Sequence, residues 1–208
     1  MKYAIEIARI LLDIKAVTLN LKEPYHYSSG LLSPIYCDNR LIISYPEKRK
    51  VVIDSLLYLI EEKNLQFDVI AGTMTAGIPY AAWISDRLNL PMVYIRDKAK
   101  TYGKKNQIEG KLRSEQRVLV VEDLISFGES TISASYALRQ FAIVKDCIAI
   151  FSYQLSKAQK NFAKANLNYY VLSNFKTLIK VAVSEGYITE KERQKVLVWN
   201  KDPENWNS

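Results

Sequence analysis

Short apolar runs alternate with helix-like patterns over residues 68–172. Runs rich in Val and Ile are typical of strands buried on both faces of a sheet, and most stretches between them place apolar residues at helical spacing. Such alternation predicts an α/β fold, with a mainly parallel central sheet whose strands are joined by right-handed helical crossovers. The strands are expected at residues 68–71, 92–95, 118–121, 146–153 and 169–172.

Residues 1–45 lie outside this alternation. A helical stripe is expected over residues 4–17, and residues 24–40 are typical of two short strands around a Ser-Ser-Gly turn. We expect this segment to form a small cap over the site, with residues 1–208 forming one domain. Further helices are expected at residues 46–63, from the turn at 72–77 to about 88, and at 132–141, 156–165, 174–183 and 189–198.

Composition excludes several classes of protein. The sequence has no run of eighteen apolar residues and no N-terminal signal peptide, so we expect a cytoplasmic protein that does not bind a membrane. Cys37 and Cys147 are too few for a disulfide framework or a zinc site, and we expect both to be reduced thiols. His26 is the one histidine and no nucleophile-elbow sequence accompanies it, which disfavours a Ser-His-Asp centre.

The chain is basic, with a formal net charge of +7. A positive surface attracts nucleic acid or a small polyanionic substrate, and it also keeps a protein soluble. Charge alone therefore does not select among these three interpretations.

The segment 117–131, RVLVVEDLISFGEST, combines a strand, two carboxylates and a helix start. Open α/β sheets bind ligands outside the carboxyl ends of their strands, where Glu122 and Asp123 are expected. A glycine-containing turn that opens a helix presents backbone N–H groups and a positive dipole end to an anion. The segment could therefore hold a phosphate and a sugar, although acidic residues also end strands and Ser, Thr and Gly also start helices in proteins without a ligand.

Two further segments could contribute to such a site. Residues 72–77, GTMTAG, form a second glycine-flanked turn after a strand. Five cations fall within ten residues of the stretch RDKAKTYGKKNQIEG, where residues 101–110 read as an exposed loop. A solvated loop is the default interpretation, but cations after a strand end could also cover an anion. These cations are Arg96, Lys98, Lys100, Lys104 and Lys105.

The segment 117–131 resembles the PRPP-binding motif of the type I phosphoribosyltransferases, in which an apolar strand precedes two acidic residues and a Thr/Ser-Gly phosphate loop. The series SSG…SPIYCDNR, AGTMTAGIP, YIRDKAK…NQIEG and VVEDLIS…G…S narrows the resemblance to the short bacterial branch that uses orotate. The resemblance implies the type I fold, a homodimer whose basic loop acts on the partner's site, and Mg²⁺-dependent transfer of phosphoribose from PRPP to orotate in UMP synthesis. It implies no binding of nucleic acid.

The resemblance also implies roles for individual residues. Lys100 and Asp123 would be catalytic, and Mg²⁺ would be held mainly by PRPP and water, without a protein metal cage. The backbone of the pyrophosphate turn would comprise Thr73, Met74, Thr75, Ala76 and Gly77. Orotate would contact Ser28, Ser29, Gly30, Tyr36 and Ser126. PRPP would contact Arg96, Lys98, Lys100, Tyr102, Glu122, Asp123, Leu124, Ile125, Ser126, Phe127, Gly128, Glu129 and Ser130.

Three residues depart from the family pattern. Tyr102 stands where the family usually has histidine, Phe127 replaces a small residue, and Glu129 places a negative charge within the phosphate loop. Two alternatives therefore stay open: a phosphoribosyltransferase for another base, and a degenerate relative that binds a nucleotide or RNA and regulates. Repulsion between Glu129 and a phosphate would weaken PRPP binding unless the carboxylate faces away.

Overall fold

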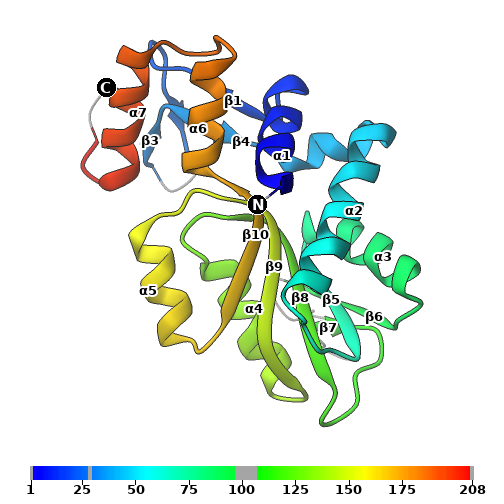
Figure 1. Ribbon diagram of the computed structural model, residues 1–208. Coiled ribbons are helices and arrows are strands. Elements are labelled where there is room, and N and C mark those ends of the chain that lie inside the picture. The colour runs from blue at the N-terminus through cyan, green and yellow to red at the C-terminus, as the bar shows by residue number, and fades with distance from the viewer. Residues whose placement is uncertain (1, 28–29, 97–106, 207–208) are drawn as a thin grey trace.

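The computed structural model describes residues 2–27, 30–96 and 107–206. Its centre is a six-stranded sheet in the order β10-β9-β8-β5-β6-β7 (Figure 1). All neighbours pair in parallel except β6 and β7, which are antiparallel. The predicted parallel α/β sheet is thus confirmed. The strands are β5 (Val69–Thr73), β6 (Met92–Ile95), β7 (Ile108–Glu109), β8 (Arg117–Ile125), β9 (Ile143–Ser152) and β10 (Asn168–Asn174).

Helices cover both faces of this sheet, which explains the nearly continuous apolar runs of its strands. One face packs against α1 (Lys2–Asp13), α2 (Pro46–Glu62) and α3 (Gly77–Leu88), and the other packs against α4 (Glu129–Arg139) and α5 (Ser156–Lys164). The buried apolar side chains form two clusters, one beneath each layer of helices. Alternate residues of β8 belong to different clusters, with Leu119 and Val121 on one face and Val118 and Val120 on the other.

A smaller body lies beyond one end of the sheet and draws on both ends of the chain (Figure 1). Its two antiparallel pairs are β1 with β4 and β2 with β3. Two helices from the other end of the chain complete it, and the Trp199 indole N–H donates to the Leu32 carbonyl at 3.1 Å. We call these elements the cap. They are β1 (Val17–Leu19), β2 (Tyr25–His26), β3 (Leu32–Ser33), β4 (Ile35–Cys37), α6 (Phe175–Ser184) and α7 (Glu190–Lys201).

Residues 1–45 coincide only in part with the cap, because α1 and η1 (Asn39–Ser44) also pack against strands of the central sheet. Helix α1 packs mainly against β10 and α6, and η1 packs against α2 and β8. The first helix ends at Asp13 rather than at residue 17, because Lys15 adopts a left-handed φ of 57° and Val17 pairs with Cys37. Contacts between the two ends of the chain were not visible in local periodicity.

Several predicted boundaries of the central elements were also wrong. Strand β8 continues through Ile125 because it pairs with β9 as far as Ser152. Helix α4 begins at Glu129, three residues before the expected start, and β9 begins at Ile143. The expected loop at residues 101–110 contains β7, whose two residues pair with Tyr94 and Ile95.

Helix caps were predicted more accurately than strand ends. The Asn174 side chain accepts a hydrogen bond from the Thr177 N–H at 3.0 Å. Thr189 and Glu192 form a complete capping box at the start of α7. Caps are read well from sequence because both partners lie within one helical turn. Among the described helices, none is long and apolar enough to cross a membrane.

Candidate functional site

The predicted site segments meet at the carboxyl ends of β5, β6 and β8. A cavity of about 220 Å³ lies there, and Arg96 at the end of β6 lines it together with Gln107. Thr73 and Met74 from the predicted pyrophosphate turn form another part of its wall, and Ser130 from the start of α4 completes this side. The tertiary structure therefore brings three segments predicted separately to one cavity.

Close packing fixes the backbone of the turn at residues 73–77. The Thr73 hydroxyl donates to the Val121 carbonyl at 3.1 Å, and Thr73 is 3% exposed. A Cβ on Gly77 would lie 2.3 Å from the Val121 carbonyl oxygen, so no larger residue fits without movement of the backbone. Met74, Thr75 and Ala76 lie closer to solvent, and the Met74–Thr75 peptide bond is cis.

Arg96 is held beside the cavity by its backbone and its side chain. Its N–H donates to the Gln107 carbonyl at 2.9 Å, and the Gln107 side chain donates to the Arg96 carbonyl at 3.1 Å. The guanidinium lies 3.6 Å from a Glu109 carboxylate oxygen. The strand β7 therefore keeps a cation at the cavity, whereas Lys98, Lys100 and Tyr102 lie outside the described residues.

The turn between β8 and α4 is shaped by Gly128 and by a contact to α5. Gly128 has a φ of 81°, and a Cβ there would lie 2.4 Å from the Phe162 ring. The Asn161 side chain donates to the Phe127 carbonyl at 3.0 Å, and the Lys157 ammonium lies 4.9 Å from the centre of the Phe127 ring. The Phe127 side chain is partly buried against the core cluster that lies beneath α1, α2 and α3, and its ring also lies beside Lys157 of α5.

The N-terminus of α4 has the arrangement expected of an anion site. Gly128 is its N-cap and provides no side chain to satisfy the first N–H groups of the helix. Ser130 lines the cavity, and Ser126 is partly buried. Unsatisfied N–H groups and the helix dipole favour an anion at this position. Leu124 and Ile125 pack into the core on opposite faces of β8, so only their backbone atoms could face a ligand.

Glu129 belongs to a different surface. It lines an open groove of about 420 Å³ between α4 and α5, together with Asn161 and Lys164. It also contributes to raising the pKa of Lys157, although the hydrogen bond from that lysine to Glu204 is the larger cause. The carboxylate is thus on the α5 side of the helix start, which is the geometry in which its repulsion of a bound phosphate is weakest.

We expect Glu129→Gln to change the KM for PRPP by less than about fivefold, because roughly 1 kcal/mol is the repulsion of two charges 4 Å apart in water-like surroundings. Steady-state kinetics at fixed orotate measure this change. A KM that falls by about a hundredfold would contradict the outward placement of the carboxylate.

The two acidic residues of β8 have different surroundings. Glu122 is 6% exposed, and its carboxylate accepts hydrogen bonds from the Thr131 hydroxyl and the Asp123 N–H, both at 3.1 Å. Burial raises the pKa of Glu122 to about 8, and the charge of Asp123 adds to the shift. Burial also raises the pKa of Asp123, but the hydrogen bond with Glu122 opposes that shift. Of the two carboxyl groups, Glu122 is thus the one whose protonated form is favoured both by burial and by the neighbouring charge.

The raised pKa of Glu122 should be visible in the stability of the protein. The unfolded Glu122 ionises near its ordinary pKa of 4.5, whereas the folded residue keeps its proton up to about pH 8. The unfolded state therefore releases the proton first, and the free energy of unfolding declines as pH rises between these values. We expect Glu122→Gln to remove this decline, as measured by urea unfolding at several pH values. Parallel pH dependences in the two proteins would contradict it.

The predicted orotate residues are only partly described. Tyr36 on β4 is 40% exposed, and its ring centre lies 5.4 Å from that of Tyr25. Gly30 is exposed with a φ of 85°, while Ser28 and Ser29 lie outside the described residues. Sequence reasoning gave no role to Gln107, Thr131 or Asn39, although Gln107 stands in the quoted NQIEG motif and Thr131 directly follows the phosphate loop. The Asn39 contact to Asp123 spans 84 residues, so local patterns could not reveal it, whereas Gln107 and Thr131 contact residues that lie 11 and 9 positions away.

Among the described residues, no group of three or more His, Cys, Asp and Glu side chains could hold a metal ion. Asp123 supplies one carboxylate near the carboxyl end of β8, and Mg²⁺ commonly needs only one or two when substrate phosphates and water complete its shell. The donor set thus fits a Mg²⁺ ion that arrives with a phosphate ligand.

Solved structures identify the class to which this fold and site belong. The orotate phosphoribosyltransferase from Aeropyrum pernix superposes with a TM-score of 0.75 and 26% identity, over 88% of this chain and 99% of that one. The sheet order, the covering helices and the phosphate turn after β8 are those of a type I phosphoribosyltransferase, as the sequence motif predicted.

Sequence relatives give the particular family. Orotate phosphoribosyltransferase from Coxiella burnetii is 66% identical over 207 residues, which cover 99% of each chain. The Enterococcus faecalis protein of the same name is 50% identical over 99% of this chain and 98% of its own length. No protein-family model matches the sequence. The chain belongs to the orotate phosphoribosyltransferase family.

Proposed function

We propose that this protein transfers the 5-phosphoribosyl group from PRPP to orotate, with Mg²⁺, and releases orotidine 5′-monophosphate and pyrophosphate. The observation that carries the proposal is the 66% identity with the Coxiella burnetii enzyme over 99% of both chains. The cavity supports it, because Arg96, the turn at residues 73–77 and the start of α4 converge there. The relatives do not favour a regulator or an enzyme for another base.

The residues have the following roles in this proposal. The N–H groups at the start of α4, with Ser126, Gly128 and Ser130, hold the 5′-phosphate. Asp123 faces the ribose and stabilises the positive charge that develops on the sugar as its C–O bond to pyrophosphate breaks. Burial raises the pKa of Glu122 to about 8, and its carboxyl group accepts a hydrogen bond from the Asp123 N–H. Arg96 and the turn at residues 73–77 contact the pyrophosphate group.

Asp123 would help to hold a Mg²⁺ ion that arrives with PRPP, and the ion would supply charge neutralisation for the leaving pyrophosphate. The orotate site includes Tyr36, Gly30, Ser126, Ser28 and Ser29, and the cap covers it. Lys98, Lys100 and Tyr102 reach the site of a partner chain in a homodimer. One domain over residues 1–208 and a cytoplasmic location are part of the same proposal, which gel filtration, limited proteolysis and cell fractionation test.

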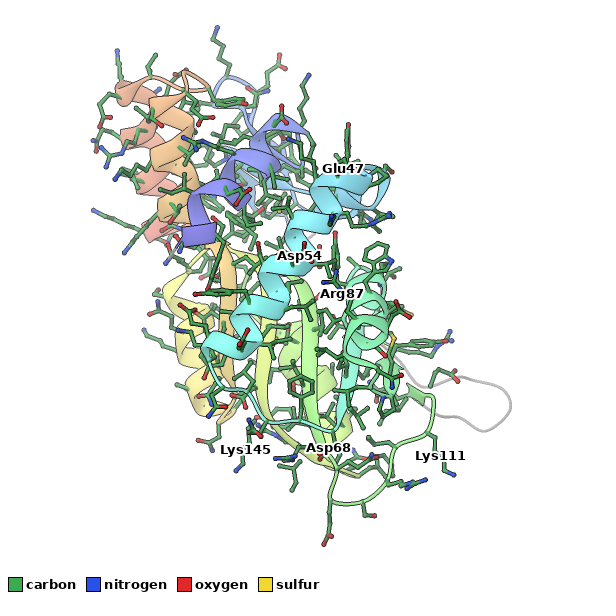
Figure 2. All side chains as sticks on the ribbon, turned by 45° about the vertical axis from the view of Figure 1, so that its right-hand side comes forward. Glu47, Asp54, Asp68, Arg87, Lys111 and Lys145 are labelled. Atoms are coloured by element: carbon green, nitrogen blue, oxygen red, sulfur yellow. The ribbon has the colours of Figure 1, made fainter. Side chains whose placement is uncertain are left out.

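The decisive experiment measures orotidine 5′-monophosphate formation from orotate, PRPP and Mg²⁺. We expect turnover by the unchanged protein and a loss of at least about a hundredfold in Lys100→Ala, because a cation at the leaving group acts mainly in the transition state. Lys145→Ala is the matched control, since Lys145 is exposed near the start of β9, at the end of the sheet away from the cap (Figure 2). No turnover above the Lys100→Ala protein would overturn the proposal.

A further inference from the structure

A buried asparagine joins the end of the cap to the central strand. Asn39 is the first residue of η1 and is 0% exposed. Its side-chain N–H donates to the Asp123 backbone carbonyl at 2.7 Å, and its side-chain oxygen accepts from the Cys37 thiol at 3.3 Å. Because a carbonyl can only accept, the contact to Asp123 fixes which end of the amide carries the N–H groups.

The bond to Asp123 lies where the sheet loses a strand. The pairing of β5 with β8 extends only to Gly72 opposite Val121, after which the chain turns away into residues 73–77. Carbonyl groups two residues apart on a strand point to the same side of the strand. The carbonyls of Val121 and Asp123 therefore both point to the edge of β8 where its pairing with β5 has ended. The Thr73 hydroxyl donates to the first at 3.1 Å and the Asn39 amide donates to the second at 2.7 Å.

Two side chains thus replace the missing strand. An unpaired carbonyl at a buried position costs free energy, and this cost is largest where water has no access. The Asn39 bond therefore favours the extended conformation of β8 past Val121, which includes Asp123 near the carboxyl end of the strand. The backbone carbonyl of Asn39 is itself anchored, because the Tyr80 hydroxyl of α3 donates to it at 2.7 Å.

We propose that Asn39 is a positioning residue for phosphoribosyl transfer, and that its amide holds the Asp123 backbone so that the carboxylate meets the ribose in the productive geometry. The proposal rests on the function proposed above. It assigns to Asn39 no contact with substrate. In this proposal, only the side-chain N–H of Asn39 positions Asp123, because the hydrogen bonds of Asn39 with Cys37 and Tyr80 do not involve Asp123.

Two substitutions test the donor. Asn39→Ala removes it, and we expect kcat to fall on the order of a hundredfold with KM values within about threefold, because a misplaced catalytic group costs mainly the transition state. Tyr80→Phe is the matched control, since it removes a buried hydrogen bond of the same length to the same residue but leaves the amide donor in place. We expect kcat within about threefold for this control.

Asn39→Asp provides a pH-dependent readout. Burial and nearby acidic groups raise the pKa of the introduced carboxyl, and only its protonated form can donate to the Asp123 carbonyl. We expect the kcat of this variant, divided by that of the unchanged protein, to rise at least about tenfold as pH falls from 8 to 6. The same ratio for Asn39→Ala should stay flat. The groups around this position are Cys37, Asp38 and Arg40 on its own segment, Asp123 and Glu122 on β8, Tyr80 on α3 and Arg49 on α2.

Hydrogen–deuterium exchange separates this proposal from the proposed function. Residues 122–126 should exchange at least about tenfold faster in Asn39→Ala than in Tyr80→Phe, whether or not the protein acts on orotate. If the protein without substitutions were inactive on orotate but the variants showed this exchange pattern, only the proposed function would be overturned. A kcat within threefold of the unchanged protein in Asn39→Ala, a pH-independent ratio in Asn39→Asp, or equal exchange in the two variants would overturn the positioning role.

Discussion

Asp123→Asn is expected to lower kcat/KM by about 100- to 1,000-fold, the range measured when one preorganised electrostatic group is removed from an active site. We expect Asp123 to carry the charge of the acidic pair, because burial raises the pKa of Glu122 to about 8. The amide keeps the shape of the side chain but cannot stabilise positive charge on the sugar. Initial rates of orotidine 5′-monophosphate formation, with circular dichroism to confirm folding, measure the effect.

Glu122→Gln is the matched control on the same strand. An amide resembles a neutral carboxyl group, and it can still accept from the Thr131 hydroxyl as Glu122 does at 3.1 Å. We expect a loss of less than about tenfold, since no charge disappears from the site. A larger loss in Glu122→Gln than in Asp123→Asn would contradict the assignment of the charge, and equal losses would indicate two ionised carboxylates acting on the ribose.

Gly77→Ala is expected to reduce the free energy of unfolding by about 3 kcal/mol, at the upper end of the usual cost of overpacking a core. The added methyl group would lie 2.3 Å from the Val121 carbonyl oxygen and 2.5 Å from the Thr73 hydroxyl oxygen. The first of these is a backbone atom of β8, so relief requires the turn at residues 73–77 to move away from that strand. Urea unfolding monitored by circular dichroism measures the loss.

Gly186→Ala separates this steric effect from the loss of a glycine as such. Gly186 has a φ of 76°, and a Cβ there would meet no atom within 4 Å. The free energy of unfolding of this control should therefore fall only by the cost of placing alanine in a left-handed conformation, about 1 kcal/mol. If both variants lose the same free energy, close packing of Gly77 against β8 does not set the cost.

Sequence patterns predicted the helix caps at Asn174 and Thr189 better than the ends of β8 and β9. A helix cap involves residues within one turn, and the capping box of Thr189 and Glu192 was placed correctly. The end of β8 was placed at Val121 because an acidic residue follows it, but the strand continues to Ile125 beside β9. The role of Asn39 was missed because its partner Asp123 lies 84 residues away in the chain.

The sequence by itself determined the order of the elements and the chemistry available at the phosphate turn. Period and residue type are properties of contiguous residues, so RVLVVEDLISFGEST could be interpreted before any contact was known. The tertiary structure alone decided how burial shifts the pKa values of Glu122 and Asp123 and on which side of α4 Glu129 lies. Both depend on burial and on neighbours from other segments, because desolvation and hydrogen bonding set a pKa and packing sets the direction of a side chain.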